Sequence, residues 1–451
     1  MHSWLVFDYH VSPANATARA PGIDFVWGSS PAHAPAWRKG SPDIIVSRYI
    51  NGNRDSTRND GNLSWWRLNH PEWVMWTCKN SSGQRSVAWS DGDVDMPLDW
   101  ANPALIEYQH AQYTCGCYVC PCAAGDPGGY NAIAVDGYHF ANFGHACGHY
   151  DRDWTDPNAQ FIMQYKTDGP AGGRWGDPRY TQAAQTWLQR FYAGLQAMTA
   201  ADRPLLILNF DLAFCKEGGC TSDDPMVLFT GNHSDGVIDE GAYTWNQAGG
   251  ELRPENQPAW LWEETLRWAT NQQVHRKGYY PIVESLNCSS PMQSAVAEDD
   301  STLSERYWHW YLASYLLAKG SSSALYISPV FADAPADRQR TVTMTYGQLP
   351  WYQLRFLAAS SVGSPAGPLV WVSAGPANNR TVATRVYTRG FVVANPLPLG
   401  TPPVKIALPA GKRYRVVGGS AQQQEQPGVH APVEGHVLVL ARNATVLQLL
   451  D

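Results

Sequence analysis

Two acidic positions follow short apolar runs of the sequence and could act together in one reaction. Asp136 follows the run 132–135, and Asp239 and Glu240 follow the run 236–238. Cleavage of a glycosidic bond requires two carboxyl groups: one protonates the leaving oxygen, and the other attacks the anomeric carbon or activates water. A single acid in such a place could equally cap a loop, but the repeated pattern indicates Asp136 and Glu240 as a candidate catalytic pair.

Other side chains near predicted strand ends could bind a sugar. Asn209 could hydrogen-bond a sugar hydroxyl or steady one of the acids, and further carboxylates would make the site acidic. Aromatic rings that follow the two acids could stack on a sugar ring. The predicted substrate-binding residues are Asp99, Tyr138, His139, Asn209, Asp239, Tyr243, Trp245 and Glu284.

An α/β barrel would bring these residues together. Short apolar runs alternate with helical patterns as far as about residue 370. The predicted strands are Gly22–Trp27, Asp43–Tyr49, Trp73–Cys78, Ala132–Asp136, Leu205–Phe210, Gly236–Asp239, Tyr280–Glu284 and Ala324–Ser328. The clearest helical patterns are Pro178–Met198, Trp260–His275 and Ser301–Leu317. Strand–helix repeats indicate parallel strands with right-handed crossovers. We therefore predict a (β/α)8 TIM barrel over residues 1–372, with its active residues at the carboxyl ends of the strands.

The pattern changes from about Arg380, where short strands are separated by proline and glycine and no helical period occurs. The predicted strands are Thr384–Ala394, Val404–Leu408, Arg413–Val417, Val437–Ala441 and Ala444–Leu449. This pattern favours a small antiparallel β domain, β-sandwich-like, over residues 380–451.

Composition and charge exclude several classes of protein. Charged residues make up 16% of the 451 residues, and the net charge is −7 without any block of Lys or Arg. Nucleic acid is therefore excluded as the main partner. No stretch of about 18 apolar residues predicts a membrane span, and we expect a monomer. The 20 Trp, 22 Tyr and 12 Phe fit either an aromatic core or exposed rings that contact sugars.

Sequons and cysteines favour a secreted glycoprotein with disulfide bonds. The seven Asn-x-Ser/Thr sequons are at Asn15, Asn62, Asn80, Asn232, Asn287, Asn379 and Asn443, and the chain has nine cysteines. Cys215 and Cys220 flank four residues and are predicted to form a local bridge. The four cysteines of the run Cys115–Cys122 could form disulfides or bind a structural zinc ion, and both interpretations stay open.

Other chemistry has weaker support in the sequence. No G-x-S-x-G elbow, Walker loop, dinucleotide fingerprint or H-E-x-x-H motif occurs, and we expect no cofactor. A cluster that could be read as a metal site, or as substrate-facing or plain surface residues, comprises His139, His145, His149, Cys147 and Asp151. Two alternative functions follow: a carbohydrate-binding barrel without catalysis, and a metal-dependent hydrolase that modifies polysaccharides, for example by deacetylation.

Several blocks of the sequence resemble a group of glycoside hydrolase barrels related to glycoside hydrolase family 114, the endo-α-1,4-polygalactosaminidases. The blocks are Asp43–Asp55, Asn62–Cys78, Met96–Gln109, Ala132–Phe143, Leu206–Phe210, Val237–Tyr243 and Arg385–Pro396. By position, the resemblance implies that Asp136 is the nucleophile or base and that Glu240 is the general acid. It also implies that Arg385–Pro396 opens the β domain that such hydrolases carry after their barrel.

Overall fold

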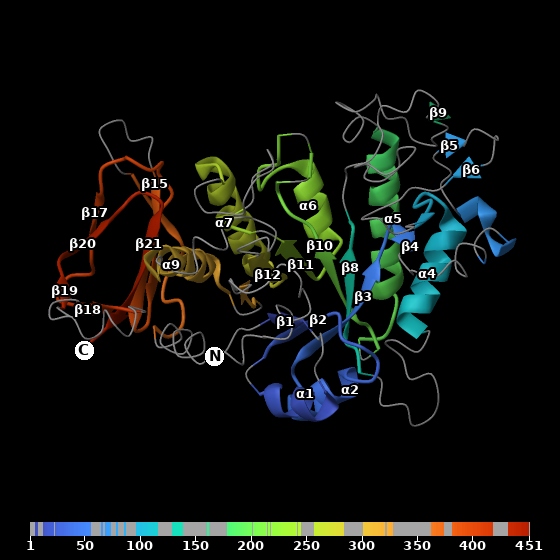
Figure 1. Cartoon of the computed structure of the whole chain (residues 1–451), viewed down its shortest axis with the longest axis horizontal. Helices are drawn as coiled ribbons and strands as arrows, with labels where there is room; N and C mark the ends of the chain where they lie inside the picture. The colour runs from blue at the N-terminus through green and yellow to red at the C-terminus, as the bar shows by residue number, and fades with distance from the viewer. Residues whose placement is uncertain are drawn as a thin grey trace. The chain divides into compact units, whose positions relative to one another are not determined.

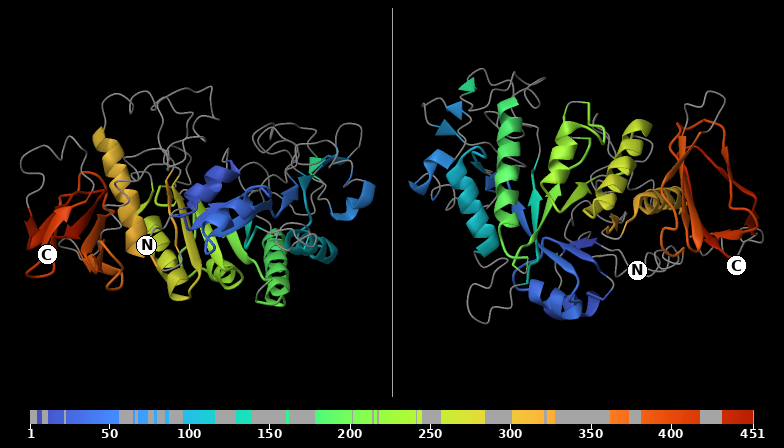
Figure 2. Two further views of the ribbon diagram at one scale, coloured as in Figure 1. Left: turned by 90° about the horizontal axis from the view of Figure 1, so that it is seen from below. Right: turned by 180° about the vertical axis from the view of Figure 1, so that it is seen from behind.

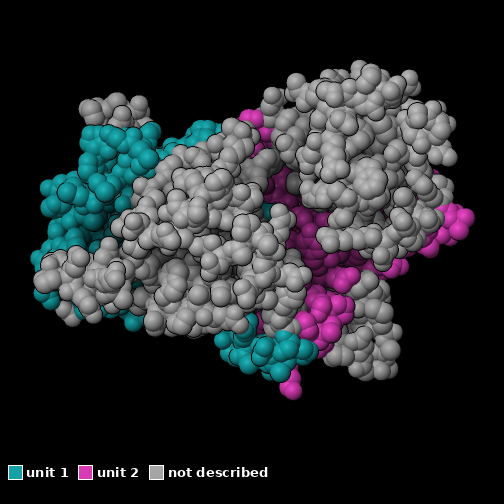
Figure 3. Space-filling model, in the orientation of Figure 1, with its two compact units in different colours: residues 1–25, 238–451 teal, residues 26–237 magenta. Residues whose placement is uncertain are grey.

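The computed structural model describes most of the helices and strands of the chain (Figure 1). The described residues are 5–7, 12–21, 23–55, 65, 68–73, 78–79, 85–86, 96–115, 129–138, 160–161, 178–200, 202–213, 215–216, 218–240, 242–244, 257–283, 301–320, 323–327, 362–373, 381–417 and 432–450. The chain divides into two compact units, shown in teal and magenta in Figure 3. Unit 1 comprises residues 1–25 and 238–451, and unit 2 comprises residues 26–237.

Unit 2 is built on strands that neighbour one another in the order β2-β3-β8-β10. Their bounds are Phe25–Trp27 for β2, Ile45–Asn51 for β3, Ala132–Asp136 for β8 and Leu205–Asn209 for β10. β8 pairs in parallel with β3 on one side and with β10 on the other. The four apolar residues of β8 have no exposed surface, as expected for a parallel strand that is covered on both faces.

Helices follow the strands of unit 2, as the sequence pattern predicts. α2 (Ala34–Gly40) precedes β3, and the later helices are α4 (Pro103–Cys115), α5 (Pro178–Gln196) and α6 (Pro225–Asn232). α5 packs against both α4 and α6, and the three lie in a row along the strands (Figure 2). The helix predicted over Pro178–Met198 is confirmed, and Ala184, Leu188, Phe191 and Leu195 of α5 are fully buried.

The predicted strand Trp73–Cys78 is wrong as a member of the parallel sheet. β3 pairs directly with β8 from Ser47↔Ala132 to Asn51↔Asp136, which leaves no edge for a strand between them. Trp73 ends the 3₁₀ helix η1 (Pro71–Trp73), and its ring stacks on His70 at 3.7 Å between centroids. Cys78 begins β5 (Cys78–Lys79) in an antiparallel sheet with β6 (Arg85–Ser86) and β9 (Gln160–Phe161), and residues 74–77 lie outside the described residues.

Unit 1 continues the alternation of strands and helices. β11 (Gly236–Glu240) enters this unit and is followed by α7 (Ala259–Val274), β12 (Gly278–Val283), α9 (Ser301–Ala318) and β13 (Tyr326–Ile327). β12 pairs with β13 in parallel. The N-terminal β1 (Leu5–Phe7) and α1 (Pro13–Arg19) also belong to unit 1. A parallel α/β class is thus confirmed, whereas closure into an eight-stranded barrel stays a prediction.

An antiparallel sheet follows, as the change of pattern predicted. Six strands pair in the order β14-β15-β16-β21-β18-β19, and β17 pairs with β20. The bounds are Val370–Ser373 (β14), Thr381–Tyr387 (β15), Gly390–Asn395 (β16), Val404–Ala407 (β17), Arg413–Val416 (β18), Val433–Glu434 (β19), His436–Val439 (β20) and Asn443–Leu449 (β21). The predicted single strand Thr384–Ala394 is wrong, because it is a hairpin that turns at residues 388–389. The boundary between residues 372 and 380 stays a prediction.

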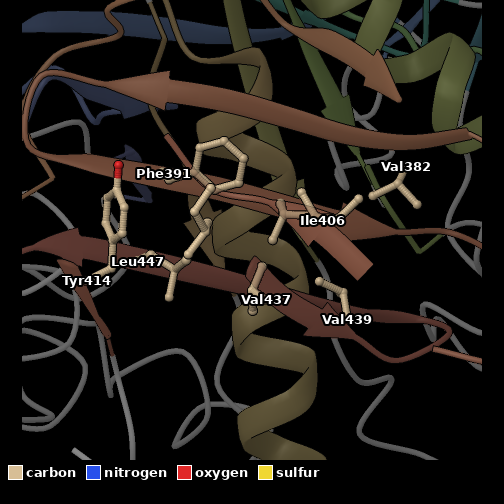
Figure 4. Packing of buried hydrophobic residues seen from close by; sticks show 9 residues of the cluster. Val382, Phe391, Ile406, Tyr414, Val437, Val439 and Leu447 are labelled. Carbon is tan, nitrogen blue, oxygen red and sulfur yellow. The ribbon is translucent and has the colours of Figure 1, made fainter. Parts of the chain in front are cut away.

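The two C-terminal sheets enclose an apolar core, shown in Figure 4. Its members are Val382, Phe391, Val393, Ile406, Leu408, Tyr414, Val437, Val439 and Leu447. α9 lies against β15, β16 and β21. Arg385 Nη1 donates to the carbonyls of Leu316, Leu317 and Lys319, at 3.3, 2.9 and 2.7 Å, and so satisfies the carboxyl end of α9. The block Arg385–Pro396 thus begins in β15 and joins the sheet to this helix.

No helix among the described residues has both the length and the apolar character that crossing a bilayer requires.

Candidate active site

Asp136 lies at the carboxyl end of the central strand β8, with its side chain partly exposed. Its Oδ1 accepts hydrogen bonds from the Gly137 amide and from Asn209 Nδ2, each at 2.8 Å. Its Oδ2 accepts a hydrogen bond from the Tyr49 hydroxyl. Hydrogen-bond donors on both oxygens hold the Asp136 carboxyl group in one orientation.

Tyr49 comes from the neighbouring strand β3, where alternate side chains share a face. Asn51, two residues further along, lies opposite Asp136 in the parallel register. The Tyr49 side chain is 39% exposed, and its ring meets that of Trp27 edge-on at 6.0 Å between centroids. Asn51 Oδ1 lies 3.4 Å from the Tyr49 hydroxyl. The hydroxyl thus has two acceptors within reach.

The backbone turns at Gly137, and this turn directs the Gly137 amide towards the Asp136 carboxyl group. Its φ is 69°, in the left-handed region that side chains with a Cβ rarely adopt. A Cβ at this position would lie 2.8 Å from Asn53 Oδ1. Both the backbone conformation and the close approach of Asn53 therefore require glycine after Asp136.

Buried side chains support the end of β8 from the segment that follows β3. The Gly52 amide donates to the main-chain carbonyl of Asp136 at 3.1 Å. The Gly52 carbonyl accepts hydrogen bonds from Trp100 Nε1 and from Gln109 Nε2, the latter at 3.1 Å. Gln109 Oε1 in turn accepts from Trp187 Nε1 at 2.7 Å. This network connects α4 and α5 to the strand end that carries Asp136.

Tyr138 is part of this support, and the prediction that it stacks on a sugar is corrected. The residue is fully buried, and its ring stacks on Trp100 at 5.6 Å and lies 6.3 Å from the ring of Phe210. A ring without exposed surface offers no face to a ligand. Its aromatic character serves the packing beneath Asp136.

Asn209 ends β10, and the loop that follows it is cross-linked. Asn209 is 7% exposed, and of its two predicted roles the structure shows the hydrogen bond to an acid. The predicted bridge between Cys215 and Cys220 is confirmed. Lys216 within the bridged loop pairs with Asp224, whose Oδ1 accepts from the Met226 amide at the start of α6. The loop is thereby joined to a helix N-terminus.

Glu240 and Asp239 end β11 in unit 1, and their surroundings differ. Glu240 is partly exposed, whereas Asp239 is 3% exposed and its Oδ2 accepts from the Tyr279 hydroxyl at 2.5 Å. Consecutive strand residues point to opposite faces, which separates the two carboxyl groups. Burial raises the pKa of Tyr279 well above its ordinary value of 10, and the charge of Asp239 raises this pKa further. Tyr279 therefore stays a neutral donor.

The turn after Glu240 is fixed by Tyr243, which is fully buried and has a φ of 68°. Its carbonyl accepts from Trp310 Nε1 at 3.2 Å, and burial, then the charge of Asp239, raise the pKa of its hydroxyl well above 10. The predictions that Asp239 and Tyr243 contact substrate are corrected, since both are buried packing groups.

Asp99 does not lie at the end of a strand of the large sheet, where it was predicted. Antiparallel β4 (Arg54–Asp55) and β7 (Met96–Pro97) precede it, so it does not follow a strand of the parallel sheet. Its amide donates to the Trp73 carbonyl at 2.8 Å, and its Oδ1 accepts from the Ala101 amide at 3.1 Å. Asp99 shapes the turn before α4.

The remaining predicted side chains are not part of the described structure. They are His139, Trp245, Glu284, and the residues His145, Cys147, His149 and Asp151 of the possible metal cluster, and the side chains of the run Cys115–Cys122 lie outside it as well. Within the described part of the chain, no group of three or more His, Cys, Asp or Glu side chains could hold a metal ion.

Sequence reasoning missed Tyr49, the donor that the structure places on Asp136. The predicted strand ended at this residue, so its position at the same strand end as Asp136 was available. Tyrosine is, however, common in strands without any functional role. The hydroxyl contact depends on the register between β3 and β8, which the sequence does not state.

Comparison with known proteins finds likenesses to solved structures only. No protein-family model matches the chain, and no curated protein matches it. An α-amylase from Geobacillus thermoleovorans, complexed with acarbose, is 11% identical over 100% of this chain and 98% of that chain, with a TM-score of 0.47. An α-amylase from Lactobacillus plantarum is 12% identical over 99% and 98%, with a TM-score of 0.46. A GH31 dextranase from Flavobacterium johnsoniae, complexed with glucose, is 9% identical over 99% of this chain and 51% of that chain, with a TM-score of 0.41. Scores below 0.5 do not establish a shared fold, so the fold and site rest on the topology and contacts described above.

Proposed function

We propose that this protein is a secreted glycoside hydrolase that cleaves O-glycosidic bonds of an oligo- or polysaccharide. Asp136 acts as nucleophile or general base, and Glu240 acts as general acid, at the carboxyl ends of the strands of a closed (β/α)8 barrel. The observation that carries this proposal is the state of Asp136: a partly exposed carboxylate at the end of a parallel strand, bonded by three donors.

The chemistry of Asp136 supports the role of the unprotonated partner. A nucleophile or base must present a lone pair in a fixed direction, and three hydrogen-bond donors hold the Asp136 carboxyl group in one orientation. Glu240 is the partly exposed acid at the end of β11, whereas the neighbouring Asp239 accepts a hydrogen bond from the Tyr279 hydroxyl. Of the two acids that end β11, Glu240 is therefore the better candidate for proton transfer.

Secretion is supported by the disulfide between Cys215 and Cys220 and by the sequons. Asn15 and Asn232, two of the seven sequon asparagines, are exposed to solvent. Glycan attachment requires such exposure.

The test is a screen of the purified protein against amino-sugar and neutral glycans, read by mass spectrometry. On a substrate that the wild type cleaves, Asp136→Asn and Glu240→Gln should each lower kcat by about 10³-fold or more. Asp202→Asn, an exposed acid before the amino end of β10, is the matched control and should keep full activity.

Full activity in both catalytic variants would refute the assignment. Binding of a glycan without cleavage would favour the alternative of a carbohydrate-binding barrel. NMR observation of the first anomer released distinguishes the two roles of Asp136, because a nucleophile retains the anomeric configuration and a general base inverts it.

A further inference from the structure

The two oxygens of the Asp136 carboxylate are bonded by different kinds of donor. Oδ1 accepts from a main-chain amide and from the buried side chain of Asn209, each at 2.8 Å. Oδ2 accepts from the hydroxyl of Tyr49, a side chain that is 39% exposed. Neither donor on Oδ1 can leave without moving the backbone or a buried residue, whereas a phenolic hydroxyl can rotate about its C–O bond.

We propose that Tyr49 is a positioning residue for Asp136 and that it marks Oδ2 as the reacting oxygen. This inference rests on the proposed function and deepens it. The Tyr49 hydroxyl orients the Oδ2 lone pairs in the resting site and gives way when substrate reaches that oxygen.

Asn51 provides the second position of the hydroxyl. Its Oδ1 lies 3.4 Å from the Tyr49 oxygen, on the same face of β3, and Asn51 is aligned with Asp136 in the register. The hydroxyl proton can therefore turn from Asp136 towards Asn51 without leaving tyrosine. The Tyr49 hydroxyl can therefore exchange one acceptor for the other, so its donor is not left without a partner when substrate binds Oδ2.

The reaction step balances in either role of Asp136. If Oδ2 attacks the anomeric carbon, a C–O bond forms as the glycosidic C–O bond breaks. The electron pair of the broken bond stays on the leaving oxygen, which takes a proton from Glu240. If Oδ2 is a base, the same lone pair takes a proton from water, and the water oxygen forms the new bond. Tyr49 keeps its own proton throughout.

Tyr49→Phe tests this inference, because it removes the hydroxyl and retains the ring that packs against Trp27. We expect kcat to fall about tenfold to hundredfold with KM changed less than about threefold. The other two donors on this carboxylate, the Gly137 amide and the Asn209 side chain, stay in place in the variant. The fall in kcat therefore reports the loss of the Oδ2 donor alone.

Tyr192→Phe is the matched control in the same unit. The Tyr192 hydroxyl also donates to an aspartate, Asp235, at 3.1 Å. Asp235 is bonded to the Leu206 amide near the amino end of β10, at the opposite strand end from Asn209. This variant loses the same kind of bond and should leave kcat and KM unchanged.

A second measurement does not depend on activity. Carbon-13 NMR of protein labelled at the aspartate carboxyl carbons, with the Asp136 signal assigned by its absence in Asp136→Asn, reports the hydrogen bonding of this carboxyl group at one fixed pH. The Asp136 chemical shift should change in Tyr49→Phe and stay constant in Tyr192→Phe.

An unchanged Asp136 chemical shift in folded Tyr49→Phe would overturn the inference, and so would a Tyr192→Phe variant that changes it equally. If Asp136→Asn keeps full activity, the proposed function fails, whereas the carboxyl chemical shift still decides whether Tyr49 positions this carboxyl group.

Discussion

A tyrosine hydroxyl donates to an aspartate near the carboxyl end of a strand in each compact unit, and the surroundings of these two contacts differ. In unit 2, the Tyr49 hydroxyl donates to Asp136, the tyrosine is 39% exposed and the aspartate is partly exposed. In unit 1, the Tyr279 hydroxyl donates to Asp239, and these residues are 2% and 3% exposed. The contact in unit 2 thus lies near solvent, and the contact in unit 1 lies in the core.

The difference assigns opposite roles to two acids that follow similar apolar runs. Water and a substrate can reach a partly exposed carboxylate, so Asp136 is suited to chemistry. A buried carboxylate must instead be compensated by its neighbours, so Asp239 with Tyr279 is suited to packing at the end of β11. A strand-end aspartate is therefore a functional candidate only where its side chain remains accessible.

Tyr279→Phe should produce the largest loss of stability in this comparison. It leaves the Asp239 carboxylate buried without its tyrosine donor, and we expect the free energy of unfolding to fall by about 2–3 kcal/mol. Urea denaturation measures this loss. Tyr49→Phe is the paired variant and should cost less than about 1 kcal/mol, because solvent can replace its hydroxyl. Equal losses in the two variants would remove the distinction between a functional and a packing pair.

Gly137→Ala should have an intermediate effect and sharpen the assignment of Asp136. A left-handed φ and a Cβ 2.8 Å from Asn53 Oδ1 should cost about 1–2 kcal/mol of stability. Because the Gly137 amide bonds the Asp136 carboxylate, kcat should fall as well. A stable variant with unchanged kcat would show that this amide does not orient the carboxylate. Gly400→Ala, another left-handed glycine with open space around it, is the control for strain alone.

A rise in pH above 10 should have the smallest effect on the free energy of unfolding. Tyr279 has a pKa raised well above 10 by burial and by the charge of Asp239, so the folded state keeps a proton that the unfolded state loses near pH 10. Stability is therefore full below pH 10 and falls above it, by about 1 kcal/mol between pH 10 and 11 for this tyrosine. Urea midpoints at pH 9, 10 and 11 should fall less steeply for Tyr279→Phe than for the wild type. Parallel slopes would mean that Tyr279 titrates normally in the folded protein.

The sequence predicted most elements that carry the candidate site. β8 has the predicted bounds, and β10 and β11 differ by one residue at their ends, because buried parallel strands appear as continuous apolar runs. The run Trp73–Cys78 has the same composition and was misassigned. Its first residue instead stacks on His70, and apolar composition alone does not distinguish these two modes of burial.

Local pattern also suffices for the bridge between Cys215 and Cys220, since the two cysteines are five positions apart. Local pattern does not suffice for the hairpin at residues 388–389, since the sequence predicts a single strand there. It also does not predict that Arg385 caps α9, because this contact joins residues more than 60 positions apart.

The positions of the acids at strand ends could be predicted locally, because strand periodicity and short-range turns depend on neighbouring residues. The accessibility of each acid and the donors that bond it follow from long-range packing. Tyr49 and Asn209 reach Asp136 from 87 and 73 positions away, and Tyr279 reaches Asp239 from 40. Burial and hydrogen bonding are properties of the packed sheet, since they depend on which strands pair and in which register.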